Sequence, residues 1–293
     1  MSILKDPYVV PSRVKGVVRY LLAAKGQREK QDILEALLSP TALISKGEDK
    51  QFSRKMVQST IRECIKIGLL EESEDGSEVA INPKLHLEEA LLPAVLTQRL
   101  LNISDLTENH DFARVLAWYL AQDFFAAPGN WRDAQQRLLD QVGEDLLELN
   151  DVRFGQFADW SCYLGFSWRN SLAGNPGLVP DPTAYLRQSL GSLFEGVANQ
   201  PIPLGEFINR LGRHCPVFET GTFREEIEKQ LEGRESNYLS SVTSIALRRL
   251  EEEKLIKLDP LSDSSIWVLQ DGADSRLTHI TWLGKQTDGG KNL

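Results

Sequence analysis

The most constraining feature of the chain is a basic, amphipathic helix pattern over residues 53–68. Apolar side chains recur there at helical spacing and predict a face that packs on a core: Val57, Ile61, Cys64 and Ile65. The opposite face is expected to carry three cations, one hydroxyl and no acidic residue: Lys55, Ser59, Arg62 and Lys66. Such a face is typical of a helix that lies against an anionic partner.

The segments around this helix predict a winged helix-turn-helix. Two helix patterns precede it, at 13–25 and 29–38, and strand patterns at 69–72 and 78–81 follow it, around the hairpin turn Asp75-Gly76. In a winged helix the second motif helix enters the DNA major groove. The candidate DNA-binding residues are therefore Arg54, Lys55, Gln58, Ser59, Arg62 and Lys66. Lys55, Arg62 and Lys66 would contact phosphates or guanine edges, Gln58 and Ser59 would read bases, and Arg54 would support them from the helix N-terminus.

The charge distribution places the basic character at the start of an otherwise acidic chain. Residues 1–70 hold 13 Lys and Arg against 7 Asp and Glu, a net charge of +6, although the whole chain has a net charge of −9. Residues 71–160 hold 6 Lys and Arg against 18 Asp and Glu, a net charge of −12. Acidic residues also surround the predicted wing turn, so the wing is expected to stay off the DNA backbone. We therefore expect modest affinity for duplex DNA.

The last segment repeats the plan of the first. Helix patterns at 204–212, 222–231 and 240–254 precede strand patterns at 255–258 and 266–269, which we expect to pair as a hairpin, and a further strand is expected at 279–283. An offset of 186 residues aligns the two third helices. The aligned outward face is mixed, with an isoleucine and an acid. The candidate partner-binding residues are therefore Ser241, Ile245, Arg248, Arg249 and Glu252, while Arg248 and Arg249 leave a DNA role open.

The predicted fold class is mainly α with small β-hairpin wings, in which two winged helix-turn-helix units flank an all-helical middle. The expected boundaries are 9–83 for the first winged-helix domain, 84–198 for the helical middle, 199–284 for the second winged-helix domain, and 285–293 for a frayed tail. Four of the six tryptophans lie in the middle segment, where packing of amphipathic helices explains them most simply.

The sequence carries no catalytic signature. It lacks phosphate-binding loops, nucleophile elbows and metalloprotease helices, so we expect no enzyme activity and no cofactor. The histidines and the three cysteines are too scattered for a metal site or a disulfide framework. No apolar run reaches the roughly 20 residues of a membrane span, and the start has no apolar signal core, so a cytoplasmic location is expected.

The opening DPYVVPSRVKG at residues 6–16, followed by the winged-helix pattern, resembles bacterial defence-island proteins. It most resembles the DpdG-like family, whose members are encoded in the gene cluster that installs 7-deazaguanine bases in DNA and restricts DNA according to that modification. This resemblance implies a partner role beside DNA-modifying or DNA-restricting enzymes in phage defence, and it supplies no catalytic residues. The acidic tandem layout also resembles accessory subunits of chromosome-structuring complexes of the ScpB and MukE types, which grip a partner chain.

Three functions thus remain open from the sequence. The first is a DNA-binding accessory protein of a DNA-modification or defence complex, which contacts duplex DNA and other proteins of that complex but no membrane. The second is an acidic scaffold that binds partner proteins through both winged units. The third is an enzyme whose site is assembled from residues distant in sequence.

Overall fold

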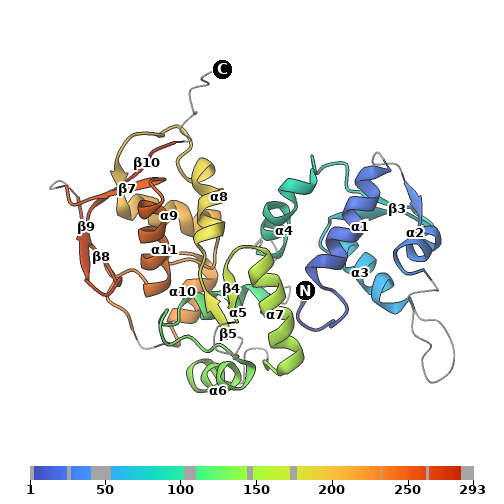
Figure 1. The fold of residues 1–293 in the computed structure, drawn as a ribbon, viewed down its shortest axis with the longest axis horizontal. Helices are drawn as coiled ribbons and strands as arrows, with labels where there is room; N and C mark the ends of the chain where they lie inside the picture. The colour runs from blue at the N-terminus through green and yellow to red at the C-terminus, as the bar shows by residue number, and fades with distance from the viewer. Residues whose placement is uncertain are drawn as a thin grey trace. The chain divides into compact units, whose positions relative to one another are not determined.

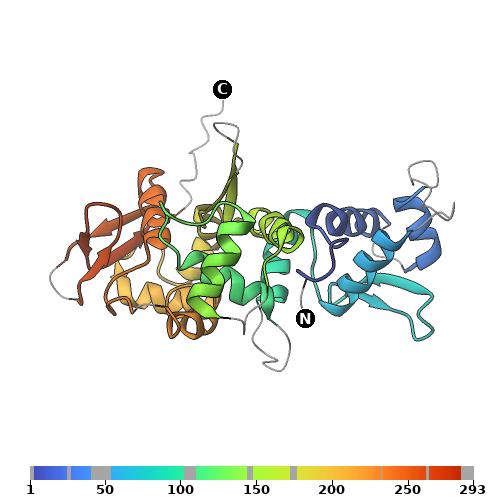
Figure 2. The same cartoon turned by 90° about the horizontal axis from the view of Figure 1, so that it is seen from below.

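The computed structural model describes residues 3–24, 28–40, 54–101, 110–143, 148–171, 177–231, 233–261 and 264–284. About half of the described residues are helical, and the described strands form small antiparallel sheets (Figures 1 and 2). The chain divides into two compact units: unit 1 is Met1–Phe112 with Asn150–Leu164, and unit 2 is Ala113–Leu149 with Gly165–Leu293. The segment 84–198, expected as one helical domain, is thus shared between the units. The expected frayed tail at 285–293 lies outside the described residues.

Unit 1 begins with a three-stranded sheet and three helices, which we call the N-terminal module. Its elements in chain order are α1 (Pro11–Ala23), β1 (Glu29–Lys30), α2 (Gln31–Leu38), α3 (Lys55–Lys66), β2 (Leu70–Glu72) and β3 (Glu78–Ile81). The strand order is β1-β3-β2, with both pairs antiparallel. Figure 1 shows α1, α2 and α3 gathered beside this sheet. The core holds the apolar stripe of α1 and the buried face of α3, as their helical spacing predicts.

The sequence misjudged which side of α2 is buried. The spacing of apolar residues in the helix pattern at 29–38 predicts one inward side made of Ile33, Leu34, Leu37 and Leu38. Leu34 is fully buried, but 42% of the Ile33 surface and 54% of the Leu37 surface are exposed. The buried side instead includes Glu35, whose carboxylate accepts hydrogen bonds from Gln31 Nε2 at 3.0 Å and Gln58 Nε2 at 2.9 Å. A buried carboxylate needs such partners, and they orient α2 with Glu35 inward.

A later helix joins unit 1 by holding the opening segment of the chain. In α7 (Asp151–Tyr163), Gln156 Nε2 donates to the Asp6 carbonyl at 2.8 Å and Trp160 Nε1 donates to the Val9 carbonyl at 3.1 Å. Both α7 side chains are buried. The opening motif at residues 6–16 therefore has a structural role, because its backbone carbonyls satisfy buried donors of α7. Unit 1 also contains η2 (Glu89–Leu91) and α4 (Leu92–Leu100).

Unit 2 contains a second module of the same strand order, which we call the C-terminal module. Its elements in chain order are α8 (Thr183–Leu193), β6 (Ile202–Pro203), α9 (Leu204–His214), α10 (Thr222–Glu228), α11 (Ser241–Glu252), β7 (Ile256–Asp259), β8 (Trp267–Leu269), β9 (Ser275–Leu277) and β10 (His279–Trp282). The sheet order is β6-β10-β7. In Figure 1 the strands β7 and β10 lie near α9 and α11.

The expected hairpin between 255–258 and 266–269 is wrong. Strand β7 pairs with β10, and β8 pairs with β9 in a separate two-stranded hairpin. The strand β10 is buried over His279, Ile280 and Thr281, so it has the character of a central strand. The hairpin β8-β9 is thus inserted into the connection between β7 and β10.

The two modules agree residue by residue at their sheets. Glu29 pairs with Val79 in the first module and Ile202 pairs with Ile280 in the second. The main-chain bonds that lead into the next helix also correspond: they are Gln31 N to Ser77 O at 2.9 Å and Leu204 N to Thr278 O at 2.7 Å. The structure therefore contains the same strand arrangement twice.

The ends of α3 and α11 correspond in the same way. Gly68 and Lys254 both have positive φ, of 69° and 59°. The next residue donates back into the helix in each case: Leu69 N bonds to Cys64 O at 2.9 Å and Leu255 N bonds to Leu250 O at 3.0 Å. The offset of 186 residues found in the sequence aligns these backbone features as well.

The remainder of unit 2 contains most of α5 (Asp111–Leu120), α6 (Trp131–Val142) and a hairpin. This hairpin pairs β4 (Ser167–Asn170) with β5 (Gly177–Pro180). The sequence had predicted an all-helical middle segment, and this prediction is wrong because the β4-β5 hairpin lies in that segment. Tyr119 of α5, which is buried, donates its hydroxyl to the Leu178 carbonyl at 2.8 Å and so attaches the hairpin to α5.

Candidate nucleic-acid interface

The helix α3 presents three exposed cations. Lys55, Arg62 and Lys66 are exposed, while Val57, Ile61 and Cys64 are buried against the module core. The described helix begins at Lys55. The expected start at Ser53 lies outside the described residues. The spacing of seven and then four residues puts the three cations on one side of the helix, as the sequence predicted.

The three cations differ in how they are held. Lys55 Nζ lies 5.6 Å from the centre of the Tyr8 ring, and Lys66 Nζ lies 3.2 Å from Glu63 Oε2. Arg62 makes no hydrogen bond or ion pair with the residues that the structure describes. Its guanidinium is therefore the one most open to an external anion, and Lys66 would have to share its charge with Glu63.

The other predicted DNA contacts are less accessible. Ser59 is only 6% exposed, so its expected place on the solvent face is wrong. A serine side chain is too short to reach past its neighbours where a lysine can extend its charged end into water. Gln58 is exposed, but its Nε2 is used by Glu35, and Arg54 is half-buried at the N-terminus of α3.

The hairpin β2-β3 that follows α3 is acidic, as expected. Asp75 at its turn accepts hydrogen bonds from the Ser73 hydroxyl at 2.6 Å and from Ser77 N at 3.0 Å, and these bonds lower the pKa of Asp75 to about 2. The turn therefore stays negative at every physiological pH. Glu72 and Glu74 beside it are exposed, so this hairpin would repel phosphates.

The equivalent helix α11 has its cations tied within unit 2. Arg248 pairs with Asp271 and Glu251, each at 2.7 Å, and its pKa is raised by these carboxylates against the effect of burial. Arg249 pairs with Asp181, and its Cζ lies 5.5 Å from the centre of the Phe124 ring. Neither guanidinium is free for an external phosphate in this arrangement.

The other candidate partner-binding residues are divided between surface and interior. Ser241 is 8% exposed and its hydroxyl accepts a hydrogen bond from Phe124 N at 2.8 Å, so the chain itself covers this position. Ile245 is half-buried and Glu252 is exposed. Only the C-terminal part of the predicted α11 face is therefore open.

A buried charge cluster holds the N-terminal end of α11. Glu219 is 4% exposed and accepts hydrogen bonds from Arg234 Nη1 and the Ser240 hydroxyl, both at 2.6 Å, and from the Thr243 hydroxyl. Burial alone would raise the pKa of Glu219, but Arg234, Arg224 and these hydroxyls lower it to about 2. The carboxylate is thus ionised, and Ser240 and Thr243 are held by it at the start of the helix.

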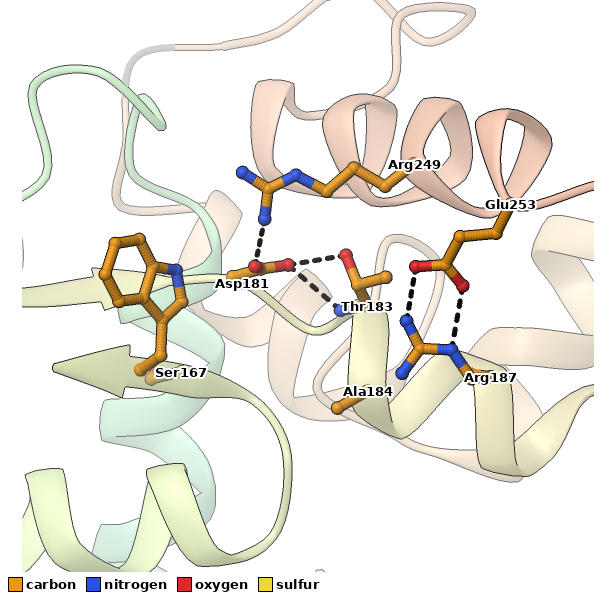
Figure 3. Close-up of a pocket in the computed structure, with 8 residues that line it drawn as sticks. Ser167, Asp181, Thr183, Ala184, Arg187, Arg249 and Glu253 are labelled. Atoms are coloured by element: carbon orange, nitrogen blue, oxygen red, sulfur yellow. Dashed lines mark hydrogen bonds and ion pairs between the residues drawn. The ribbon is translucent and has the colours of Figure 1, made fainter. Parts of the chain in front are cut away.

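Unit 2 also contains an open pocket of about 350 Å³ between the β4-β5 hairpin, α8 and α11 (Figure 3). Its walls include Ser167, Trp168, Asp181, Arg187, Arg249 and Glu253. No local sequence pattern indicates this pocket, because its ion pairs join residues that are far apart along the chain, such as Asp181 and Arg249.

The described residues contain no group of three or more His, Cys, Asp or Glu that could hold a metal ion. Burial raises the pKa of both the Cys64 and Cys215 thiols to about 12, so these thiols stay protonated and unreactive. Within the described part of the chain, none of the helices has the length and apolar character that a bilayer crossing requires.

A profile of the DpdG-like family matches residues 1–264, which run from before α1 to beyond β7. The chain belongs to the DpdG-like family. The resemblance inferred from the opening segment and the layout is thus confirmed. No curated protein and no solved structure matches this DpdG-like chain. Membership in the family points to a role in the DpdG-associated modification system.

Proposed function

We propose that this DpdG-like protein is a non-catalytic, DNA-binding accessory protein of a bacterial DNA-modification or anti-phage defence system. Both modules are interpreted as winged helices, and α3 of the N-terminal module contacts duplex DNA. The observation that carries this proposal is the exposed row Lys55, Arg62 and Lys66 on the helix that occupies the recognition position. The protein acts in the cytoplasm and its partners there are other proteins of the same system.

The topology favours this interpretation of the N-terminal module. Three helices and a sheet of order β1-β3-β2, in which the last two strands form a hairpin, follow the plan of a winged helix. In that plan α3 is the helix that enters the major groove. Arg62 is the residue best placed to donate two hydrogen bonds to a guanine edge or a phosphate.

The electrostatics limit the affinity. Three exposed cations predict about three phosphate contacts, so the logarithm of the binding constant should fall with the logarithm of salt concentration with a slope of about −3. The acidic turn at Asp75 and the net charge of −9 oppose binding. The protein therefore relies on a partner for stable attachment to DNA.

The test is the double charge reversal Arg62→Glu with Lys66→Glu, assayed by gel shift on duplex DNA at low salt. We expect a loss of affinity of about tenfold or more, because about two phosphate contacts become repulsive. The matched control reverses two exposed cations of unit 2, Lys229→Glu with Arg276→Glu, which changes the net charge equally. Equal weakening by both pairs, or unchanged binding in the α3 variant at intact fold, would contradict contact through α3.

A scaffold role is the second candidate, and the covered face of α11 favours it. The cations of α11 already bind carboxylates of unit 2, which leaves Ile245 and Glu252 for a protein partner. Co-purification distinguishes the two functions. A partner complex that survives nuclease and high salt in the Arg62→Glu, Lys66→Glu variant would favour the scaffold.

A further inference from the structure

The pocket beside α8 has an aromatic wall that is open to solvent. Trp168 lies on β4 and 41% of its surface is exposed. Its backbone is fixed by pairing with Val179 of β5. An indole held on a short hairpin offers a flat surface on which another ring can stack.

The charged walls of the pocket cancel one another. Arg187 donates to Glu253 through Nε at 2.8 Å and through Nη2 at 2.5 Å, and Arg249 pairs with Asp181 (Figure 3). The four ionised side chains therefore have no net charge. A phosphate or other anion would meet two carboxylates for two arginines, so the pocket does not favour an anionic ligand.

The same ion pairs fix a mixed set of donors and acceptors around the pocket. The bond to Asp181 and the Phe124 ring hold Arg249 from two sides, and a bidentate pair holds Arg187. Guanidinium N–H groups and carboxylate oxygens at fixed places match a ligand edge that both accepts and donates. Ser167, which also lines the pocket, has a buried Oγ without a partner among the described residues.

The size of the pocket fits a small ring system. Small-molecule sites begin at about 300 Å³, and this pocket has about 350 Å³. We propose that it binds a flat, uncharged heteroaromatic ring of nucleobase type, stacked on Trp168, with its polar edge toward the Arg187–Glu253 and Arg249–Asp181 pairs. The ring is supplied by a free nucleoside or by an unpaired base of a nucleic acid.

The experiment measures binding to the full chain by equilibrium dialysis. The four probes are guanosine, adenosine, a single-stranded deoxyoligonucleotide and its duplex. The Arg62→Glu, Lys66→Glu background is used so that contact through α3 does not contribute, and nucleoside binding is expected to be unchanged in it. We expect Trp168→Ala to weaken ring binding by about fivefold or more, because one stacking wall is lost. Trp168→Phe keeps a stacking face and should weaken it far less.

The matched control is Trp131→Ala. Trp131 is 38% exposed and also lies beside an arginine, with Arg132 Cζ at 5.3 Å from its ring, but it does not line the pocket. Its replacement should leave binding unchanged. Sensitivity of the nucleosides to Trp168→Ala assigns the site to free rings, and sensitivity of the single strand alone assigns it to unpaired bases.

Three results would overturn the proposal. In the first, the correctly folded protein binds none of the four probes. Another is equal weakening by Trp168→Ala and Trp131→Ala. The third is displacement of the probe by inorganic phosphate, which would make the pocket an anion site. None of these results bears on duplex binding by α3.

Discussion

The helices α3 and α11 occupy equivalent places in two modules with the same strand order, but their outward faces differ in what covers them. On α3, the guanidinium of Arg62 has no partner among the described residues. On α11, both arginines bind carboxylates of the same unit, and Phe124 lies over Arg249. The comparison teaches that a shared architecture does not imply a shared surface, because neighbouring elements decide which side chains of equivalent helices stay exposed.

The buried cluster around Glu219 should give the largest effect in any test of this comparison. We expect Glu219→Gln to lower the free energy of unfolding by about 3 kcal/mol, because Arg234 and Arg224 lose their buried counter-charge. Urea unfolding measures the change, and hydrogen exchange should rise at the start of α11. The control Glu206→Gln removes an exposed pair with Arg210 and should cost only about 0.5 kcal/mol. Similar costs for the two variants would refute the role of the cluster.

The same residue gives the comparison a pH dependence. The folded pKa of Glu219 is about 2, below the value of about 4.3 in an unfolded chain. Its contribution to stability is therefore complete above the unfolded value and is lost as pH falls toward 2. Glu219→Gln should remove this part of the acid sensitivity, which unfolding curves between pH 5 and pH 2 would reveal.

Substitutions at the two helix ends should change the free energy of unfolding by smaller amounts, and in opposite directions. Gly68→Ala should destabilise the N-terminal module by about 1 kcal/mol, because a side chain is strained at a φ of 69°. Lys254→Gly should stabilise the C-terminal module by up to about 1 kcal/mol, since it removes the same strain. A Cβ at Gly68 would also meet the movable end of Arg99, at 3.2 Å from Nη1. Thermal unfolding that shifts in the same direction for both variants would break the correspondence.

The smallest expected effect concerns the exposed acid of α11. Glu252→Lys gives α11 the cation that α3 has at the aligned residue, Lys66. We expect no gain in duplex binding by gel shift in the Arg62→Glu, Lys66→Glu background, because Arg248 and Arg249 stay paired and Ser241 stays covered. Restored binding would mean that charge alone separates the two helices.

The elements that the sequence predicted well are those with local signals. The cores of α3 and α11 follow from helical spacing, and the turn at Gly68 follows from the conformation that glycine allows. The exposed places of Lys55, Arg62 and Lys66 were predicted in the same way.

The elements that the sequence missed depend on contacts between distant residues. Strand patterns at 256–259 and 267–269 are equally compatible with pairing to each other, and only the buried strand β10 decides between partners. The inward side of α2 depends on the bond between Glu35 and Gln58. The pocket depends on the pair Asp181–Arg249, and no local pattern indicates such a pair.

The position of β10 in its sheet has a consequence for how the protein forms during synthesis. In the N-terminal module the central strand β3 ends at Ile81, so that sheet can close early on the ribosome. In the C-terminal module the central strand β10 is the last element described, and β6 and β7 have no common partner until it emerges. The edges of β6 and β7 therefore stay unpaired while the β8-β9 hairpin is synthesised. During this interval the nascent chain is most exposed to incorrect strand pairing and to chaperone binding.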